Sequence, residues 1–498
     1  MMRITFICIV SIFFFSKSYT QNNIFLSRDY WKLNPSIDKI KNDILNGNDP
    51  TQMNFYGFDA VVYSLLENVN YPSIKYLLEI EGNELEKKTH DSRTYIFWAA
   101  YKANLKIMHY LLRKDVQTNI YDSNGNNPIT FAASTGQKNI EVYNLFEKYG
   151  SILTDEINRD GANILLLISP FLEDYKEIEY FTSKGFSIED KDLKGNNIFN
   201  YSSKKVNISF LKKLVEKGVN PKITSKDGWN AISFACQGTR NHSNSLNKFK
   251  YLESLGIEVN FTLKNGFTPI HLLVNKYKDP DIFNYFIKKG VDVNQRDING
   301  NTAFINAAFK NDIKIIDLLF KSVDNINLSN KKGITALMRA VQNNSPSVVS
   351  YLLENGSDPF LKDIYDNNIA FYLIESFKRE NLEQFNNKVT LLNTYGFEID
   401  DKPQGGGNSL IHITAKKMDL DLVKWLMQYK LNINQKNEEG NTALHIVAMK
   451  AKDDKLLKFL IRNGANKEIK TDFNESAIDL ALENELLIKN KINLNFLK

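Results

Sequence analysis

A spacing of about 33 residues between similar turns constrains this fold more than any other feature of the sequence. The segment GNTALHIVA, which begins at Gly440, has looser counterparts along the chain, and adjacent copies begin 33 to 41 residues apart. The thirteen markers that hold this phase are Gly57, Ser92, Gly125, Gly161, Gly195, Gly228, Gly266, Gly300, Gly333, Asp366, Gly407, Gly440 and Asn474. Such a period indicates stacked repeats, each of which buries its apolar surface only against its neighbours.

Each repeat is predicted to contain two short helices. The first follows the marker, and the second is an amphipathic segment such as LLKFLIRNG at 456–464. Its apolar residues recur at i, i+3 and i+4, which gives the helix one buried stripe. Gly464 lies just past this stripe, where a left-handed helix stop favours glycine.

This pattern resembles the ankyrin repeat. The signature of a turn glycine followed by Thr-Pro-Leu-His is best kept at 266–271 (GFTPIH) and 440–445 (GNTALH), and the asparagine after the second helix matches at Asn294. Tetratricopeptide repeats have a similar period but lack this glycine turn. The resemblance covers about residues 30–490. It implies a mainly α fold, an ankyrin-repeat solenoid of helix pairs joined by short β-hairpin turns.

We predict four segments in the chain. Residues 1–20 are a signal peptide, 21–56 an N-terminal capping segment with a worn repeat, 57–473 about twelve ankyrin repeats, and 474–498 a C-terminal capping half-repeat. The alternative for the first segment is a buried N-terminal strand or helix. No later stretch reaches the roughly 18 apolar residues that would span a bilayer.

The first twenty residues have the pattern of a secretory signal. Arg3 precedes the apolar run ITFICIVSIFFF, and small residues precede a predicted cleavage between Thr20 and Gln21. Cleavage would lower the formal net charge from +5 to about +3, which is too little to indicate a nucleic-acid partner. It would leave Cys236 as the single cysteine, so no internal disulfide is expected.

The sequence offers no pattern typical of an enzyme. His271, His412 and His445 each lie five residues after a marker, the position of the signature histidine, which orders the turn in ankyrin repeats. We expect all three to be buried at the start of a first helix. We therefore predict no catalytic residue, no cofactor and no metal site. Three repeats carry insertions between their two helices: near Gln137, at 237–247 and at 375–387. The alternative, an enzyme, would need an active site built on these insertions, for instance around His242.

Candidate partner-binding residues follow from the resemblance, because ankyrin arrays bind at turn tips and at the exposed end of the first helix. These positions are the two before each marker, the one after it, and the ninth and tenth after it. Aromatic rings there are interface candidates, or they pack on neighbouring turns. Lysines at the tenth position are candidates for a basic stripe, or they simply end helices. The candidates are Tyr56, Phe58, Tyr101, Trp229, Phe267, Phe309, Lys276 and Lys310.

The function predicted from these features is that of a non-enzymatic, exported scaffold. It is expected to be a monomer that recognises a protein partner through its concave surface of hairpins and inner helices, in the periplasm or outside the cell. The signal segment and the Asn/Lys/Ile bias resemble exported ankyrin proteins of Bacteroidetes-type bacteria. Two alternatives stay open: an accessory protein for a periplasmic enzyme such as catalase in oxidative-stress defence, and a secreted effector that acts on host proteins.

Overall fold

The computed structural model describes residues 23–498, so the predicted signal peptide and its cleavage site lie outside the described residues. The described residues divide into two compact units, 23–223 and 224–498, which are treated separately. Among residues 23–498, no helix has both the length and the apolar character that a membrane span requires.

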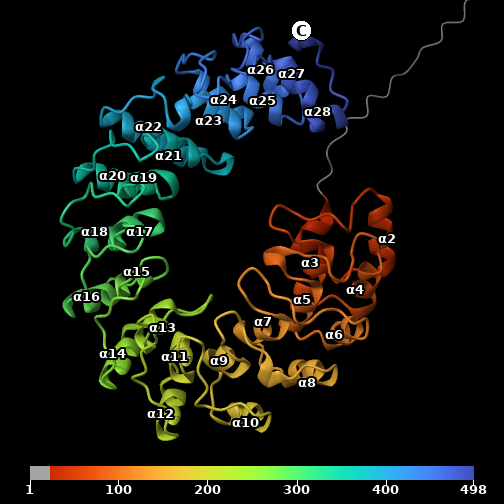
Figure 1. The fold of residues 1–498 in the computed structure, drawn as a ribbon, viewed down its shortest axis with the longest axis vertical. Coiled ribbons are helices and arrows are strands. Elements are labelled where there is room, and N and C mark those ends of the chain that lie inside the picture. The colour runs from red at the N-terminus through yellow and green to blue at the C-terminus, as the bar shows by residue number, and fades with distance from the viewer. Residues whose placement is uncertain (1–22) are drawn as a thin grey trace, which may run out of the picture. The chain divides into compact units, whose positions relative to one another are not determined.

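In the first unit, two short helices at the N-terminal end, α1 (Arg28–Lys32) and α2 (Ile37–Leu45), are followed by five helix pairs (Figure 1). The first helices of these pairs are α3 (Ala60–Leu66), α5 (Tyr95–Tyr101), α7 (Pro128–Ser134), α9 (Ile164–Ile168) and α11 (Ile198–Ser202). The second helices are α4 (Tyr71–Leu78), α6 (Leu105–Leu112), α8 (Ile140–Lys148), α10 (Lys176–Ser183) and α12 (Ile208–Glu216).

The second unit contains eight helix pairs. The first helices are α13 (Ala231–Gln237), α15 (Pro269–Leu273), α17 (Ala303–Lys310), α19 (Ala336–Asn343), α21 (Ile369–Glu375), α23 (Leu410–Lys416), α25 (Ala443–Lys450) and α27 (Ala477–Glu483). The second helices are α14 (Leu246–Ser254), α16 (Pro280–Lys288), α18 (Ile313–Phe320), α20 (Pro346–Glu354), α22 (Leu382–Thr394), α24 (Leu420–Met427), α26 (Lys455–Arg462) and α28 (Glu485–Lys489). A helix pair thus follows each of the thirteen markers, and the predicted helical solenoid is confirmed.

The connecting turns are simpler than the predicted β-hairpins. Within residues 23–498 their arms form isolated antiparallel bridges, such as Ser329 with Thr335, and no strand. The arms are too short to continue a ladder beyond one pair of residues. Short 3₁₀ helices fill other connections: Ile24–Leu26, His90–Ser92, Leu153–Asp155, Ser169–Phe171, Ser203–Lys205, Arg379–Asn381, Gly405–Gly407 and Asn495–Leu497.

Backbone hydrogen bonds join most turns to the next turn in their unit. At Gly266, φ is 82° and a Cβ atom would lie 2.7 Å from the Arg296 carbonyl oxygen, so only glycine fits. The Ile298 N–H donates to the Asn265 carbonyl at 2.8 Å, which links this turn to the following one. These links set the spacing of adjacent repeats.

An Asp or Asn three residues before the marker fixes most of these turns. Asp297, which is almost fully buried, accepts 2.8 Å hydrogen bonds from the backbone N–H groups of Asn299 and Asn301. The same double acceptance occurs at Asn54, Asp122, Asp192, Asn330, Asp363 and Asn437. The buried carboxylate or amide satisfies backbone donors that a tight turn would otherwise leave unpaired.

The three signature histidines lie where the sequence predicts them. His271, His412 and His445 are all at most 1% exposed and occupy the first turn of a first helix. In each, Nδ1 accepts from the capping Thr or Ser, and Nε2 donates to a carbonyl near the next turn, that of Asn301, Asn441 or Ile469. Burial lowers the pKa of all three, which favours the neutral ring. Their predicted burial at the start of a first helix is confirmed.

Candidate protein-binding surface

The turn before α3 presents two aromatic rings to solvent. Phe55 is 96% exposed and Tyr56 is 67% exposed, and their rings pack edge to face with centroids 5.4 Å apart. The Asn54 side chain accepts from the N–H groups of Tyr56 and Phe58 and so fixes the turn. Phe55 is absent from the sequence-based candidates, although it occupies one of the two positions before the marker.

Phe58 and Tyr101 belong to a different environment, a row of aromatic rings along the first helices of the first unit. Phe58 stacks on His90 with centroids 4.5 Å apart and lies 5.8 Å from Trp98. The Tyr101 ring is 5.8 Å from Phe131, which in turn is 5.9 Å from Trp98. Phe58 and Tyr101 are half-buried, because they pack between repeats and expose only one side of each ring to solvent.

Arg93 lies within this aromatic row. Its guanidinium stands 4.1 Å from the Phe131 ring centroid, and its Nε donates to the buried Asp122 carboxylate at 2.8 Å. The side chain therefore joins an aromatic ring to the carboxylate that fixes the next turn. Its charge is neutralised there and is not available to a partner.

Trp229 and Phe267 each follow the marker glycine of adjacent repeats, a position at which the two rings could touch, but each ring packs within its own repeat. The Trp229 ring packs edge to face on Phe234, with centroids 5.5 Å apart, and Phe267 stacks on His271 at the same distance. Among the described residues, no ring contact joins Trp229 to Phe267. Each ring is half-buried against its own repeat.

The structure does bring Phe267, Lys276 and Lys310 together around one hollow in the second unit. The hollow has a volume of about 480 Å³ and is open to solvent. Its other lining residues are Gln237, Gly238, Thr239, Arg240, His271, Leu272 and Asn275. Phe309, the remaining candidate, lies outside this lining, and the guanidinium of Arg339 is 5.5 Å from its ring centroid.

The two candidate lysines differ in their surroundings. Lys276 is half-buried and donates from Nζ to the carbonyl oxygens of Thr239 and His242, and burial lowers its pKa. Lys310 is exposed at the end of α17. The predicted basic stripe is interrupted elsewhere as well, because Lys417 pairs with Glu375 at 3.1 Å.

A second hollow of about 520 Å³ lies between α21 and α23. Tyr365, Phe371 and Ile413 line it together with Gly405 and Gly406, which belong to the glycine-rich turn before α23. In this turn, the Gly405 N–H donates to the Asn367 side chain at 3.0 Å, and a Cβ atom at Gly405 would lie 2.8 Å from the Tyr365 carbonyl oxygen. The close approach of the two turns thus requires glycine here.

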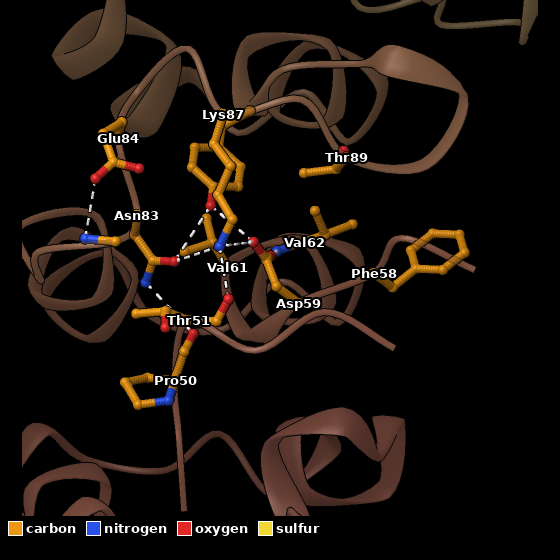
Figure 2. Close-up of polar contacts among 12 residues, drawn as sticks. Pro50, Thr51, Phe58, Asp59, Val61, Val62, Asn83, Glu84, Lys87 and Thr89 are labelled. Atoms are coloured by element: carbon orange, nitrogen blue, oxygen red, sulfur yellow. Dashed lines mark hydrogen bonds and ion pairs between the residues drawn. The ribbon is translucent and has the colours of Figure 1, made fainter. Parts of the chain in front are cut away.

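A buried polar cluster near the N-terminal end of the first unit resembles a reactive site in composition (Figure 2). Lys87 Nζ lies 3.1 Å from Asp59 Oδ2 and donates to the Thr51 carbonyl and to Asn83 Oδ1. The Tyr95 hydroxyl donates to Asp59 at 2.7 Å, and burial, with the nearby Asp59 carboxylate, raises the pKa of Tyr95 far above its usual range. The charges are satisfied by one another, so the cluster joins neighbouring segments.

Other potentially reactive side chains are also buried or hydrogen-bonded within the protein. Cys236 is fully buried on α13, and burial raises its thiol pKa. His242 is half-buried, with Nε2 3.3 Å from the Asn244 side-chain oxygen. Within residues 23–498, no group of three or more His, Cys, Asp and Glu side chains is placed to hold a metal ion.

Comparison with known proteins places most of the chain in one family. A family model described as "Ankyrin repeats (3 copies)" matches residues 60–155, 198–297, 270–363 and 380–495. An ankyrin repeat protein of Fowlpox virus is 30% identical over 25% of this chain and 38% of its own length. An ankyrin repeat protein of Acanthamoeba polyphaga mimivirus is 21% identical over 50% of this chain and 32% of its own length.

A relative of different character is the phosphocholine transferase AnkX of Legionella pneumophila. It is 22% identical over 48% of this chain and 23% of its own length. The chain thus spans less than two fifths of the length of each of these three relatives. A likeness over part of each chain carries no activity from one protein to the other.

Proposed function

Because this chain belongs to the ankyrin-repeat family, we propose that it is a non-enzymatic scaffold that binds a protein partner through its turn tips and first helices. We propose further that it is exported and acts in the periplasm or outside the cell. The Arg3-led apolar run and the small residues before Gln21 support export. Catalysis receives no support from the described histidines of the signature, whose ring nitrogens are both engaged.

The exposure of Phe55 and Tyr56 is the observation that carries the binding proposal. Burying one large aromatic side chain gains about 1.5–3 kcal/mol of free energy relative to leaving it exposed. Two adjacent exposed rings therefore forgo this gain unless a partner covers them. Clustered exposed aromatics are the residues that most often anchor interfaces. Asn54 holds their turn in place, so a partner would meet a surface that is already ordered.

Partner capture with in-cell cross-linking tests this proposal. Tagged full-length protein is expressed in its native cells, cross-linked and purified, and N-terminal sequencing of the purified chain checks for a start at Gln21. The double variant Phe55→Ala/Tyr56→Ala should capture the partner at least about tenfold less well, as expected for a hot spot. Its thermal stability should be unchanged, because exposed side chains contribute little to the core.

Phe473→Ala is the matched control, because Phe473 is 82% exposed and directly precedes the last marker. This variant also removes an exposed aromatic side chain from a turn, but in a different repeat. Equal loss of capture in both variants would indicate non-specific adhesion. Capture that survives Phe55→Ala/Tyr56→Ala would contradict binding at this tip.

A further inference from the structure

We propose that the hollow beside α13, α15 and α17 is a docking site for an acidic, partly apolar segment of the partner protein. This inference rests on the proposed binding function and specifies the partner's chemistry. Its parts are the insertion after α13, the Phe267 ring, and the cations Arg240 and Lys310. Figure 1 shows α13, α15 and α17 in consecutive repeats of the second unit.

One wall of the hollow is the inserted loop between α13 and α14. α13 ends at Gln237, and Gly238 turns the chain with φ of 61°. Thr239 and His242 then pair through two mutual backbone hydrogen bonds of 3.2 Å. Lys276 Nζ, from the next repeat, donates to the carbonyl oxygens of both residues and holds this small bridge against α15.

The far end of the loop is fixed equally well. The Asn244 side-chain amide donates to the Ala235 carbonyl at 3.0 Å, and the Tyr277 hydroxyl donates to the same oxygen at 2.7 Å. The Asn244 N–H donates to the Tyr277 hydroxyl at 3.1 Å. Asn244 and Tyr277 are both buried. A loop held at both ends loses little conformational entropy when a ligand binds beside it.

The hollow carries positive charge that nothing in the described chain neutralises. Arg240 on the loop and Lys310 at the end of α17 are both exposed, and neither forms an ion pair with an acidic side chain of residues 23–498. The nearby Lys278, in contrast, has Asp312 at 4.0 Å. An arginine fork beside a lysine suits a carboxylate, which the guanidinium can bind through two parallel hydrogen bonds.

The lining of the hollow also includes apolar side chains. Phe267 stacks on His271 with an interplanar angle of 15°, and Leu272 is half-buried beside them. Burial lowers the His271 pKa, which favours the neutral imidazole, so this ring adds no charge to the hollow. Two free cations next to an aromatic ring fit a peptide in which acidic and apolar residues alternate. Extended nucleic acid would need a longer run of cations.

Peptide binding to the full-length protein tests the inference. The probe is a fluorescein-labelled peptide of alternating Glu and Leu, and its counterpart carries Gln in place of Glu. Fluorescence anisotropy should show the Glu peptide binding at least about tenfold tighter than the Gln peptide, with affinity falling as salt rises. Arg240→Ala/Lys310→Ala should abolish this preference, and circular dichroism should confirm an unchanged fold.

Lys450→Ala is the matched control, since Lys450 is the exposed last residue of α25 just as Lys310 ends α17. This variant should bind the Glu peptide with an affinity within about twofold of the wild-type value. An equal loss in the control would overturn the inference in favour of general charge attraction. Single-stranded DNA or a phosphopeptide that binds the hollow tighter than the Glu peptide would overturn it as well.

The partner capture described above separates this inference from the proposed function. If Arg240→Ala/Lys310→Ala still captures the partner fully while Phe55→Ala/Tyr56→Ala does not, the scaffold function stands and the hollow is not its docking site. If both variants lose capture, both proposals are supported. If neither loses capture, the hollow is not needed for the partner and the inference fails.

Discussion

Single residues in this chain combine to close turns and join repeats, and Lys87 is the clearest case (Figure 2). Its ammonium lies 3.1 Å from the fully buried Asp59 carboxylate. Lys87→Met leaves that carboxylate without its cation, so we expect the free energy of unfolding to fall by about 3 kcal/mol. Urea denaturation followed by circular dichroism measures the change.

Lys88→Met provides the comparison, because Lys88 is the exposed neighbour. It should change stability by no more than about 0.5 kcal/mol. The double variant Asp59→Asn/Lys87→Met should recover part of the loss, since asparagine can still cap α3 but carries no charge. Equal stability of Lys87→Met and Lys88→Met would show that the buried pair contributes nothing.

At the level of elements, α22 differs most from its counterparts. The sequence marks residues 375–387 as an insertion, and the structure shows a 3₁₀ turn that leads into a helix of 13 residues. Lys388 on this helix is only 5% exposed and donates to the Val341 carbonyl of α19 at 2.9 Å. Burial, with a smaller effect of Lys378, lowers the pKa of Lys388 from 10.5 to about 8.

Replacing this lysine should stabilise the protein near neutral pH. Between about pH 8 and pH 10.5 the unfolded chain binds more protons at Lys388 than the folded chain, so wild-type stability rises with pH in that window. Below it the buried charge carries its full penalty. We therefore expect Lys388→Met to raise the unfolding free energy by about 1–2 kcal/mol near pH 7.

The gain should shrink as pH approaches 10.5, where Lys388 is neutral in both states. Urea denaturation of the wild type and of Lys388→Met, near pH 7 and near pH 10.5, measures this difference in unfolding free energy. A loss of stability of equal size at both ends would show that the bond to Val341 outweighs the desolvation of the charge.

The sequence predicted correctly those features that recur once in every repeat. The helix pairs and the buried histidines follow from residues that recur at fixed distances from a marker, and each such position has one environment. Contacts that depend on non-periodic residues were not predictable. The Thr239–His242 bridge comes from an insertion, and Lys276 reaches it across 37 and 34 positions of sequence. The Trp229 and Phe267 rings share a position but turn toward different residues of their own repeats.

At the level of the whole molecule, the repeats of each unit contact mainly their sequence neighbours. α18 packs against α17 of its own repeat and against α16 and α20 of the adjacent ones. The stability of such a stack is close to a sum of repeat and interface contributions, so damage should stay local. A globular core of the same size would instead spread the damage to every element that shares it.

Ile316, which is fully buried in α18, makes this expectation measurable. Ile316→Ala removes core volume at a cost of about 3 kcal/mol. Hydrogen–deuterium exchange should then show faster exchange in α16 to α20, fading toward α25, and unchanged protection in the helices of the first unit. Lys314→Ala, at an exposed position of the same helix, should leave the exchange pattern intact. A uniform loss of protection along residues 23–498 would contradict local coupling, because it would require the repeats to unfold as one cooperative body.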